Sequence, residues 1–127
     1  MYCSGAGSAA EKLAALAAVD FDKRICQRNK LAVWFAFRGE SRSRLTYRKI
    51  CTESSREYRQ IMTRLCEEII LEGGYQVRAG DVAIGLLAID EGLWLDLLLT
   101  PAEMSPGQAL NISLTYLRAV FPKHFSI

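Results

Sequence analysis

The sequence predicts an all-α fold, a bundle of five helices. Apolar residues recur at steps of three and four through most of the chain, which is the period of helices that bury one face. No segment alternates apolar and polar residues between hairpin turns, so no strand is predicted. The stretches between the periodic segments are short, which is typical of neighbouring helices in a bundle.

The composition is that of one folded domain. The chain has 127 residues, of which 50% are hydrophobic and 24% charged, and this excludes a disordered protein. Residues 1–7 are small and polar, and we expect them to be a frayed end. Residues 8–127 are expected to form the single domain.

The first two helices are predicted from a capping signal and from an apolar run. Ser8 and Glu11 have the spacing of a capping box, which predicts a helix that continues to about Phe21. A second helix is predicted from about Asp22 to Arg38. Its seven consecutive non-polar residues, 31–37, leave it almost no polar side, so we expect this helix to be central.

The third helix, about Ser43 to Glu72, has the most regular period. Gly73-Gly74 ends it, because glycine tolerates the left-handed conformation at a helix C-terminus. The positions three and four apart that form its predicted buried stripe are Tyr47, Ile50, Cys51, Ser54, Tyr58, Ile61, Leu65 and Ile69.

The last two helices are predicted at about Asp81 to Leu99 and from Ser105-Pro106 to Pro122, with Ser105 as N-cap. The fourth is apolar all round, so it needs cover from the bundle or from a second copy of the chain. Asp90, Glu91 and Asp96 interrupt it, which argues against a membrane span. The first residues of the sequence lack the basic and hydrophobic regions of a signal peptide, so we expect a cytoplasmic protein that binds no membrane.

Motifs for catalysis are absent from the sequence. The one histidine, His124, lies close to the end of the chain, and Cys3, Cys26, Cys51 and Cys66 stand far apart. No nucleophile–base pair, metal-ligand cluster or phosphate loop can be assembled from these positions. We therefore expect neither an enzyme nor a metal site nor a cofactor, and we expect the cysteines to be reduced thiols.

The aromatic residues suggest either a pocket or a core. Trp34 and Phe37 lie three apart and share a helix face, and Tyr58 lies near Met62 on the third helix. Trp94 is expected to be buried on the fourth. Such walls can hold a small apolar or cationic ligand, but the same spacing also fits a well-packed core.

Two segments carry a resemblance to a known family. Val33-Trp34-Phe35-Ala36-Phe37 and Asp90-Glu91-Gly92-Leu93-Trp94-Leu95 are similar to the "WxAF" and "DGLWL" words of BetI-type members of the TetR family of transcriptional repressors. The resemblance runs from about Ala10 to Phe121. It implies a C-terminal, ligand-binding half, with DNA bound only through an N-terminal helix-turn-helix domain that is missing here.

The resemblance also implies an effector site and a homodimer. A small molecule, choline-like or another cationic amphiphile, would bind between the second, third and fourth helices, and the last two helices would pair with a second copy. The ligand-binding residues are then Trp34, Phe37, Tyr58, Met62 and Trp94, with Asp90 or Glu91 as the polar group. The dimer-interface residues are Gly85, Ala88, Gly92, Leu95, Leu110, Leu114 and Leu117, with Ala83 as a further small residue.

The charge distribution supports a second hypothesis. Between Lys23 and Arg64 stand twelve Lys and Arg against three Glu, whereas residues 67–103 carry eight acidic residues and one Arg. The chain could be a stand-alone adaptor module whose basic third helix docks on acidic protein or nucleic acid. Such binding would weaken steeply with salt.

Overall fold

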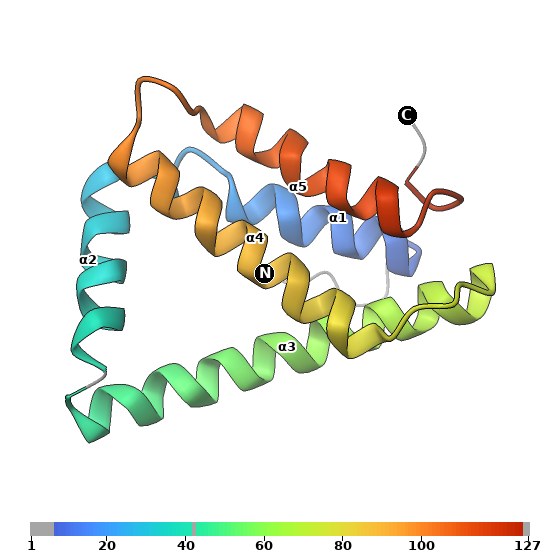
Figure 1. The fold of residues 1–127 in the computed structure, drawn as a ribbon, viewed down its shortest axis with the longest axis horizontal. Helices are drawn as coiled ribbons and strands as arrows, with labels where there is room; N and C mark the ends of the chain where they lie inside the picture. The colour runs from blue at the N-terminus through green and yellow to red at the C-terminus, as the bar shows by residue number, and fades with distance from the viewer. Residues whose placement is uncertain (1–6, 42, 126–127) are drawn as a thin grey trace.

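The computed structural model describes residues 7–41 and 43–125, apart from the side chains of Tyr47 and Ser54. It contains α1 (Ala9–Asp20), α2 (Arg28–Glu40), α3 (Leu45–Gly73), α4 (Ala79–Leu99) and α5 (Pro106–Val120) (Figure 1). No strand occurs among these described residues, and the all-α, five-helix prediction is confirmed. Of the predicted frayed end, residues 1–6 lie outside the described part of the chain, and Cys3 lies there too.

The predicted helix ends are confirmed where capping chemistry defines them. The Ser8 hydroxyl accepts the Glu11 N–H over 3.2 Å, and the Glu11 carboxylate accepts the Ser8 N–H over 2.8 Å. Ser105 caps α5 in the same way, accepting from the Gln108 N–H over 3.1 Å. Gly74 ends α3 with a φ of 66°, in the left-handed region.

The predicted start of the second helix was wrong. The helix begins at Arg28 rather than Asp22, and residues 22–26 form a turn. The Asp22 carboxylate accepts the Arg24 N–H over 2.8 Å, which offers the backbone a turn in place of a helix.

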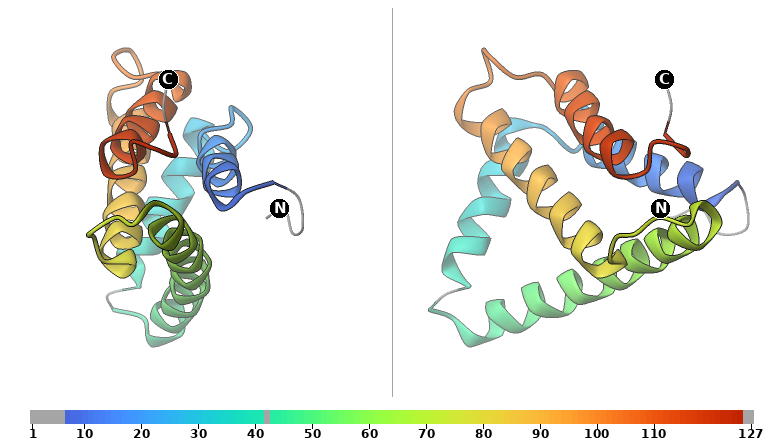
Figure 2. Two further views of the ribbon diagram at one scale, coloured as in Figure 1. Left: turned by 90° about the vertical axis from the view of Figure 1, so that its right-hand side faces the viewer. Right: turned by 45° about the vertical axis from the view of Figure 1, so that its right-hand side comes forward.

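The helices are arranged around α4. This helix packs against α3 and α5 and also contacts α2, while α1 lies against α3 and α5. Figure 1 shows α2 standing between the first turns of α3 and the last turns of α4. The two further views show that α3 extends beyond the layer formed by α1, α4 and α5 (Figure 2).

Two apolar clusters form the interior. The larger one joins α1, the C-terminal half of α3, α4 and the end of α5, with Leu13, Ile69 and Phe121 fully buried. The smaller one joins Phe21 and Leu31 to the last turns of α4 and the first turn of α5. The clusters lie towards opposite ends of α4.

The prediction that the second helix is central was wrong. Of residues 31–37 only Leu31 is buried, and Val33 is 70% exposed. The helix stands at one edge of the molecule, and its main helix contacts are with α3 and α4. The stripe on α3 is likewise incomplete, because Ile50 lies beyond the end of the bundle and is half exposed.

Candidate functional site

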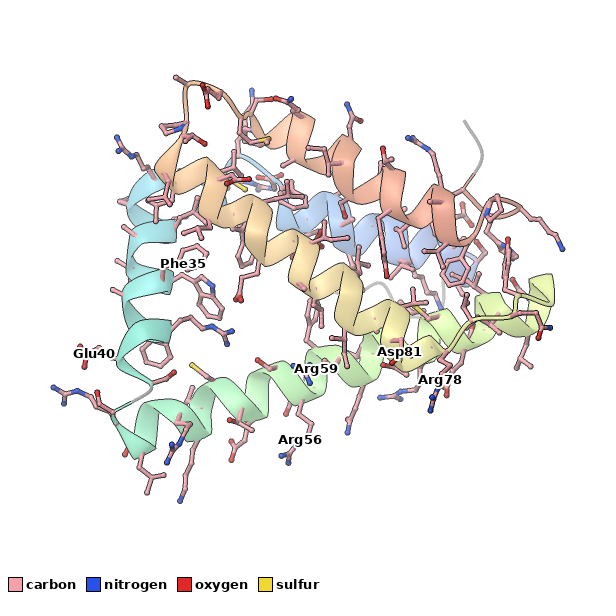
Figure 3. All side chains as sticks on the ribbon, in the orientation of Figure 1. Phe35, Glu40, Arg56, Arg59, Arg78 and Asp81 are labelled. Atoms are coloured by element: carbon pink, nitrogen blue, oxygen red, sulfur yellow. The ribbon has the colours of Figure 1, made fainter. Side chains whose placement is uncertain are left out.

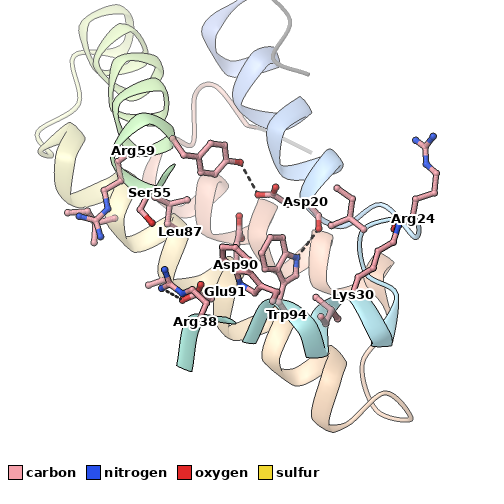
Figure 4. A pocket seen from close by; sticks show the side chains of 16 residues that line it. Asp20, Arg24, Lys30, Arg38, Ser55, Arg59, Leu87, Asp90, Glu91 and Trp94 are labelled. Carbon is pink, nitrogen blue, oxygen red and sulfur yellow. Dashed lines mark hydrogen bonds and ion pairs between the residues drawn. The ribbon is translucent and has the colours of Figure 1, made fainter. Parts of the chain in front are cut away.

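A cavity of about 650 Å³ lies between α2, α3 and α4 and reaches the turn after α1. Its size is within the range of pockets that enclose small organic ligands. Side chains from α2, α3 and α4 point towards one another across this region (Figure 3). The close view shows the lining residues, with Asp90 and Trp94 in the middle (Figure 4).

Three aromatic side chains form much of the wall. Trp34 of α2 and Trp94 of α4 meet edge to face, with ring centroids 6.2 Å apart and planes at 88°. Tyr58 of α3 lines the cavity as well. Two indoles at right angles present both a ring face and a ring edge to the space beside them, an arrangement suited to a cation or an apolar group.

Asp90 is the most unusual group in the site. Its side chain on α4 is only 4% exposed, and neither carboxyl oxygen has a hydrogen-bond partner among the described residues. Burial raises the pKa of Asp90 to about 7. The neighbouring Ser113 hydroxyl on α5, itself buried and without a hydrogen bond of normal geometry to a described residue, opposes the shift, and the negative charge of Asp20 adds to it. A buried carboxyl without a partner is costly, so this one is available to a ligand.

Asp20 is a second carboxyl in the same cavity, and sequence reasoning missed it. It is the last residue of α1, and its Oδ2 accepts the Tyr58 hydroxyl over 3.0 Å. Burial raises its pKa to about 6, against the opposing effect of the Tyr58 hydrogen bond. Its main-chain oxygen accepts the Trp94 indole N–H over 2.8 Å. The sequence feature that could have indicated Asp20 as a site residue is its position at the end of a predicted helix, directly before the apolar Phe21.

An ion pair closes one side of the cavity. Arg38 Nη2 lies 3.1 Å from Glu91 Oε1, joining α2 to α4. The same guanidinium lies 5.5 Å from the centroid of the Trp34 ring. The Trp34 indole N–H is buried and has no hydrogen-bond partner among the described residues, so this residue of the cavity lining has an unsatisfied donor.

The structure brings together four of the six predicted ligand-binding residues. Trp34, Tyr58, Asp90 and Trp94 all line the cavity, as does Glu91. The prediction was wrong for Met62, which is 1% exposed and packs in the larger apolar cluster. It was also wrong for Phe37, which is half-buried on α2 but does not line the cavity.

The predicted dimer residues divide into two groups. Gly92 and Leu95 are exposed on α4, Ala88 is exposed at the rim of the cavity, and Leu110 and Leu114 of α5 are half-buried. The remaining three belong to the interior of the protomer. Leu117 and Ala83 are completely buried, and the Tyr116 hydroxyl of the same chain covers Gly85. Within the protomer, Leu117 and Ala83 thus offer no exposed surface to a partner, and Gly85 is half-buried.

His124 contacts two neighbouring side chains through its ring nitrogens. His124 Nδ1 lies 2.9 Å from the Tyr75 hydroxyl, and its Nε2 lies 3.1 Å from a Glu72 oxygen. The thiols of Cys26, Cys51 and Cys66 are free. Over residues 7–41 and 43–125, no helix is long and apolar enough to cross a membrane.

Comparisons with known proteins agree with this architecture. Residues 9–122 match the family model for the C-terminal domain of BetI-type transcriptional repressors. The chain belongs to this family. The BetI-type match confirms the resemblance carried by the two tryptophan segments, both of which contribute to the cavity wall.

A solved structure has the same fold. It is the crystal structure of a protein assigned as a transcriptional regulator from Pseudomonas aeruginosa PAO1, 27% identical, with a TM-score of 0.84. The match covers 96% of the present chain and 61% of that protein, so the BetI-type domain spans well under two thirds of the length of its solved relative. No curated protein matches this chain.

Proposed function

We propose that this chain is the effector-sensing and dimerisation domain of a BetI-type repressor, and that its cavity binds a small organic cation. The observation that carries the proposal is Asp90, a carboxyl that is 4% exposed and has both oxygens unpartnered within the described residues. A cation beside it would supply the missing partner.

The aromatic walls favour the same ligand class. A cation placed over an indole face is attracted by the ring electrons, and the attraction grows when water is excluded. Trp34, Trp94 and Tyr58 surround the space that Asp90 lines. An apolar ligand would fit the rings but would leave the carboxyl uncompensated, which is unfavourable in a buried site.

Binding of a cation would also change the ionisation of the site. With a pKa near 7, Asp90 is partly protonated at neutral pH in the empty domain. A positive charge a few ångströms away favours the ionised form and lowers this pKa. Cation binding is therefore accompanied by proton release.

Dimerisation is proposed through the outer faces of α4 and α5. Ala88, Gly92, Leu95 and Leu99 recur at steps of three and four and are exposed on α4, and Ile112 is 39% exposed on α5. A continuous apolar strip of this kind is costly in water and suits an interface that buries roughly 1,000 Å² or more. Sedimentation equilibrium at micromolar concentration should show a dimer, and a pure monomer would exclude this part of the proposal.

The cellular role follows from the family. In a complete repressor, occupation of the cavity would be communicated to a DNA-binding domain that precedes the region matched here, in the cytoplasm where DNA is accessible. The solved relative is long enough to hold such a domain in addition to this one. The DNA sequence that is recognised, and whether the effector weakens or strengthens DNA binding, would be determined by the DNA-binding domain and its coupling to this one.

Thermal-shift measurements with choline test the effector site. Choline at about a hundred times its dissociation constant should raise the free energy of unfolding by roughly 2.7 kcal/mol. The rise should disappear in Trp34→Ala, Trp94→Ala and Asp90→Asn, and it should persist in Asp96→Asn, which removes an exposed carboxylate from the same helix. Folded Trp34→Ala and Trp94→Ala variants that respond like the parent would place the pocket elsewhere.

A further inference from the structure

A second depression adjoins the candidate effector cavity. It has a volume of about 620 Å³ and lies along α3 and the end of α2. Arg38, Ser55 and Arg59 line both spaces, so these three side chains form the border between them. Ser55 and Arg59 stand four residues apart on α3 and therefore share a face.

The two spaces have opposite chemistry. The inner cavity holds the buried carboxyl of Asp90, the carboxyl of Asp20 and the aromatic walls. The outer groove is lined by four arginines and by hydroxyl and amide side chains, and no Asp or Glu is among its described lining residues. The arginines are Arg38, Arg48, Arg56 and Arg59.

Most of this positive charge is uncompensated. Arg38 pairs with Glu91, but among the described residues no carboxylate forms an ion pair with Arg48, Arg56 or Arg59. Ser55, Thr52 and Thr63 add hydroxyl groups beside them. Guanidinium and hydroxyl donors together are the groups that bind carboxylates and phosphates in proteins.

The charged side chains on either side of Asp90 differ, and this difference indicates the direction in which a ligand could extend from the cavity. In the view of Figure 4, Arg59, Ser55 and Arg38 lie on one side of Asp90, and Arg24 and Lys30 lie on the other. The Arg24 guanidinium is bound to Asp22, and Lys30 Nζ donates to the Arg24 main-chain oxygen. Lys30 keeps its charge, but the side towards Arg59 is the one that borders the arginine-lined groove.

We propose that the effector is a zwitterion, with an ammonium group at one end and a carboxylate or phosphate at the other. The ammonium end would occupy the inner cavity beside Asp90 and the two indoles. The anionic end would pass Ser55 and reach Arg59 at the start of the outer groove. The inference rests on the proposed function, because it assumes that the inner cavity takes the cation.

Three probes with the same trimethylammonium head test this inference. Choline ends in a hydroxyl, 4-trimethylammoniobutanoate in a carboxylate and phosphocholine in a phosphate. Calorimetric titration of the intact chain should show at least one zwitterion binding about tenfold more tightly than choline, as expected for a charge pair at a partly shielded site. Which zwitterion binds more tightly identifies the anionic group.

Variants of Arg59 locate the second half of the site. Arg59→Gln should reduce the preference for the zwitterion to less than about threefold by weakening zwitterion binding, while choline, whose cavity Arg59 also lines, should bind as tightly as before or more tightly because a positive charge is removed; Arg59→Glu should make choline the tighter ligand. The control is Arg64→Gln, which removes the same charge from the same helix at a position that lines neither space. It should keep the full preference.

The outcomes separate this inference from the proposed function. If choline binds but neither zwitterion binds more tightly, or if the preference survives in Arg59→Gln, the effector is a simple cation and the zwitterion inference is wrong. If none of the three probes binds while the chain is folded, the cation site itself is wrong and both proposals fall. If Arg64→Gln loses the preference as Arg59→Gln does, the effect is one of overall charge, and the inference is overturned.

Discussion

The indole N–H of Trp94 donates to the main-chain oxygen of Asp20 over 2.8 Å and so joins α4 to the last residue of α1. The second indole of the pair, Trp34, has no hydrogen-bond partner for its N–H among the described residues. The two tryptophans are in ring contact, but only the indole N–H of Trp94 is hydrogen-bonded to a described residue. This difference should appear in the free energy of unfolding when each residue is replaced.

Replacing each tryptophan by phenylalanine should separate these roles. Trp94→Phe keeps an aromatic ring but removes a hydrogen bond to a part-buried oxygen, which costs about 1 kcal/mol beyond the loss of ring volume. Trp34→Phe loses similar volume and no hydrogen bond. We expect urea denaturation to show Trp94→Phe as the less stable variant by about 1 kcal/mol. Equal losses would mean that the Asp20 contact contributes nothing.

The stability of the empty domain should fall as the pH rises from about 5 to 8. Asp90 has a folded pKa of about 7, well above its ordinary value of 3.8, so the folded state holds the proton more tightly than the unfolded state. The resulting penalty is absent below the ordinary pKa, grows as the pH rises between the two values, and is complete above about 7. Its full size is on the order of 4 kcal/mol.

Asp90→Asn should remove most of this dependence. The amide does not titrate, so the slope that remains belongs mainly to Asp20, whose pKa is about 6. Asp96→Asn, an exposed change on the same helix, should keep the parent slope. Urea unfolding at several pH values measures the effect, and a parent protein with flat stability between pH 5 and 8 would contradict it.

Tyr58→Phe should raise the pKa of Asp20. The Tyr58 hydroxyl donates to Asp20 Oδ2 over 3.0 Å and lowers the pKa of that carboxyl against the effect of burial. Without this bond only the burial effect remains, so the carboxyl should titrate above 6. Carboxyl ¹³C NMR follows the group directly. A titration midpoint that stays the same or falls in the variant would show that the hydroxyl does not stabilise the charged form.

Choline affinity should increase with pH. The ionised form of Asp90 attracts the cation, and its fraction rises by about tenfold between pH 6 and 8 if the pKa is near 7. Calorimetric titration should therefore show up to about a tenfold tighter complex at pH 8, with proton release visible in buffers of different ionisation enthalpy. Asp90→Asn should bind weakly at both pH values.

Local signals in the sequence predicted the fold well. The capping serines at 8 and 105 and the glycine at 74 act through their own backbone neighbours, so their effects are visible without knowledge of the tertiary structure. The turn at Asp22 is also local, but its side-chain hydrogen bond to the Arg24 N–H competes with a helical pattern that looked continuous.

Burial was harder to predict, because it depends on which helices meet. The apolar run 31–37 reads as a core helix, yet α2 lies at the edge and turns only part of its surface towards α3 and α4. Met62 and Tyr58 are four residues apart on α3, but the slight rotation between them places Met62 in the core and Tyr58 in the cavity wall. Asp20 lies on the same face of α1 as Leu13 and Ala17, but the helical period does not show that this end of the helix meets α3 and α4.

Two glycine-to-alanine substitutions on α4 separately test the packing inside one protomer and the proposed dimer contact. A Cβ at Gly85 would lie 2.5 Å from the Tyr116 hydroxyl, which donates to the Val82 main-chain oxygen. Gly85→Ala should therefore destabilise the protomer despite the better helix propensity of alanine, and the loss should be smaller in a Tyr116→Phe background. A Cβ at Gly92 would meet no atom of the described residues within 4 Å.

Gly92→Ala should act on association instead. Within one protomer the alanine favours the helix by up to about 1 kcal/mol, so the monomer should be at least as stable as the parent. If a partner helix approaches α4 closely at Gly92, the added methyl group separates the two helices and weakens the dimer. Sedimentation equilibrium and urea denaturation at two protein concentrations measure both effects. A dimer as tight as the parent's would exclude close approach of a partner helix at Gly92, and Leu95→Glu on the same strip then tests whether this face of α4 lies in the interface at all.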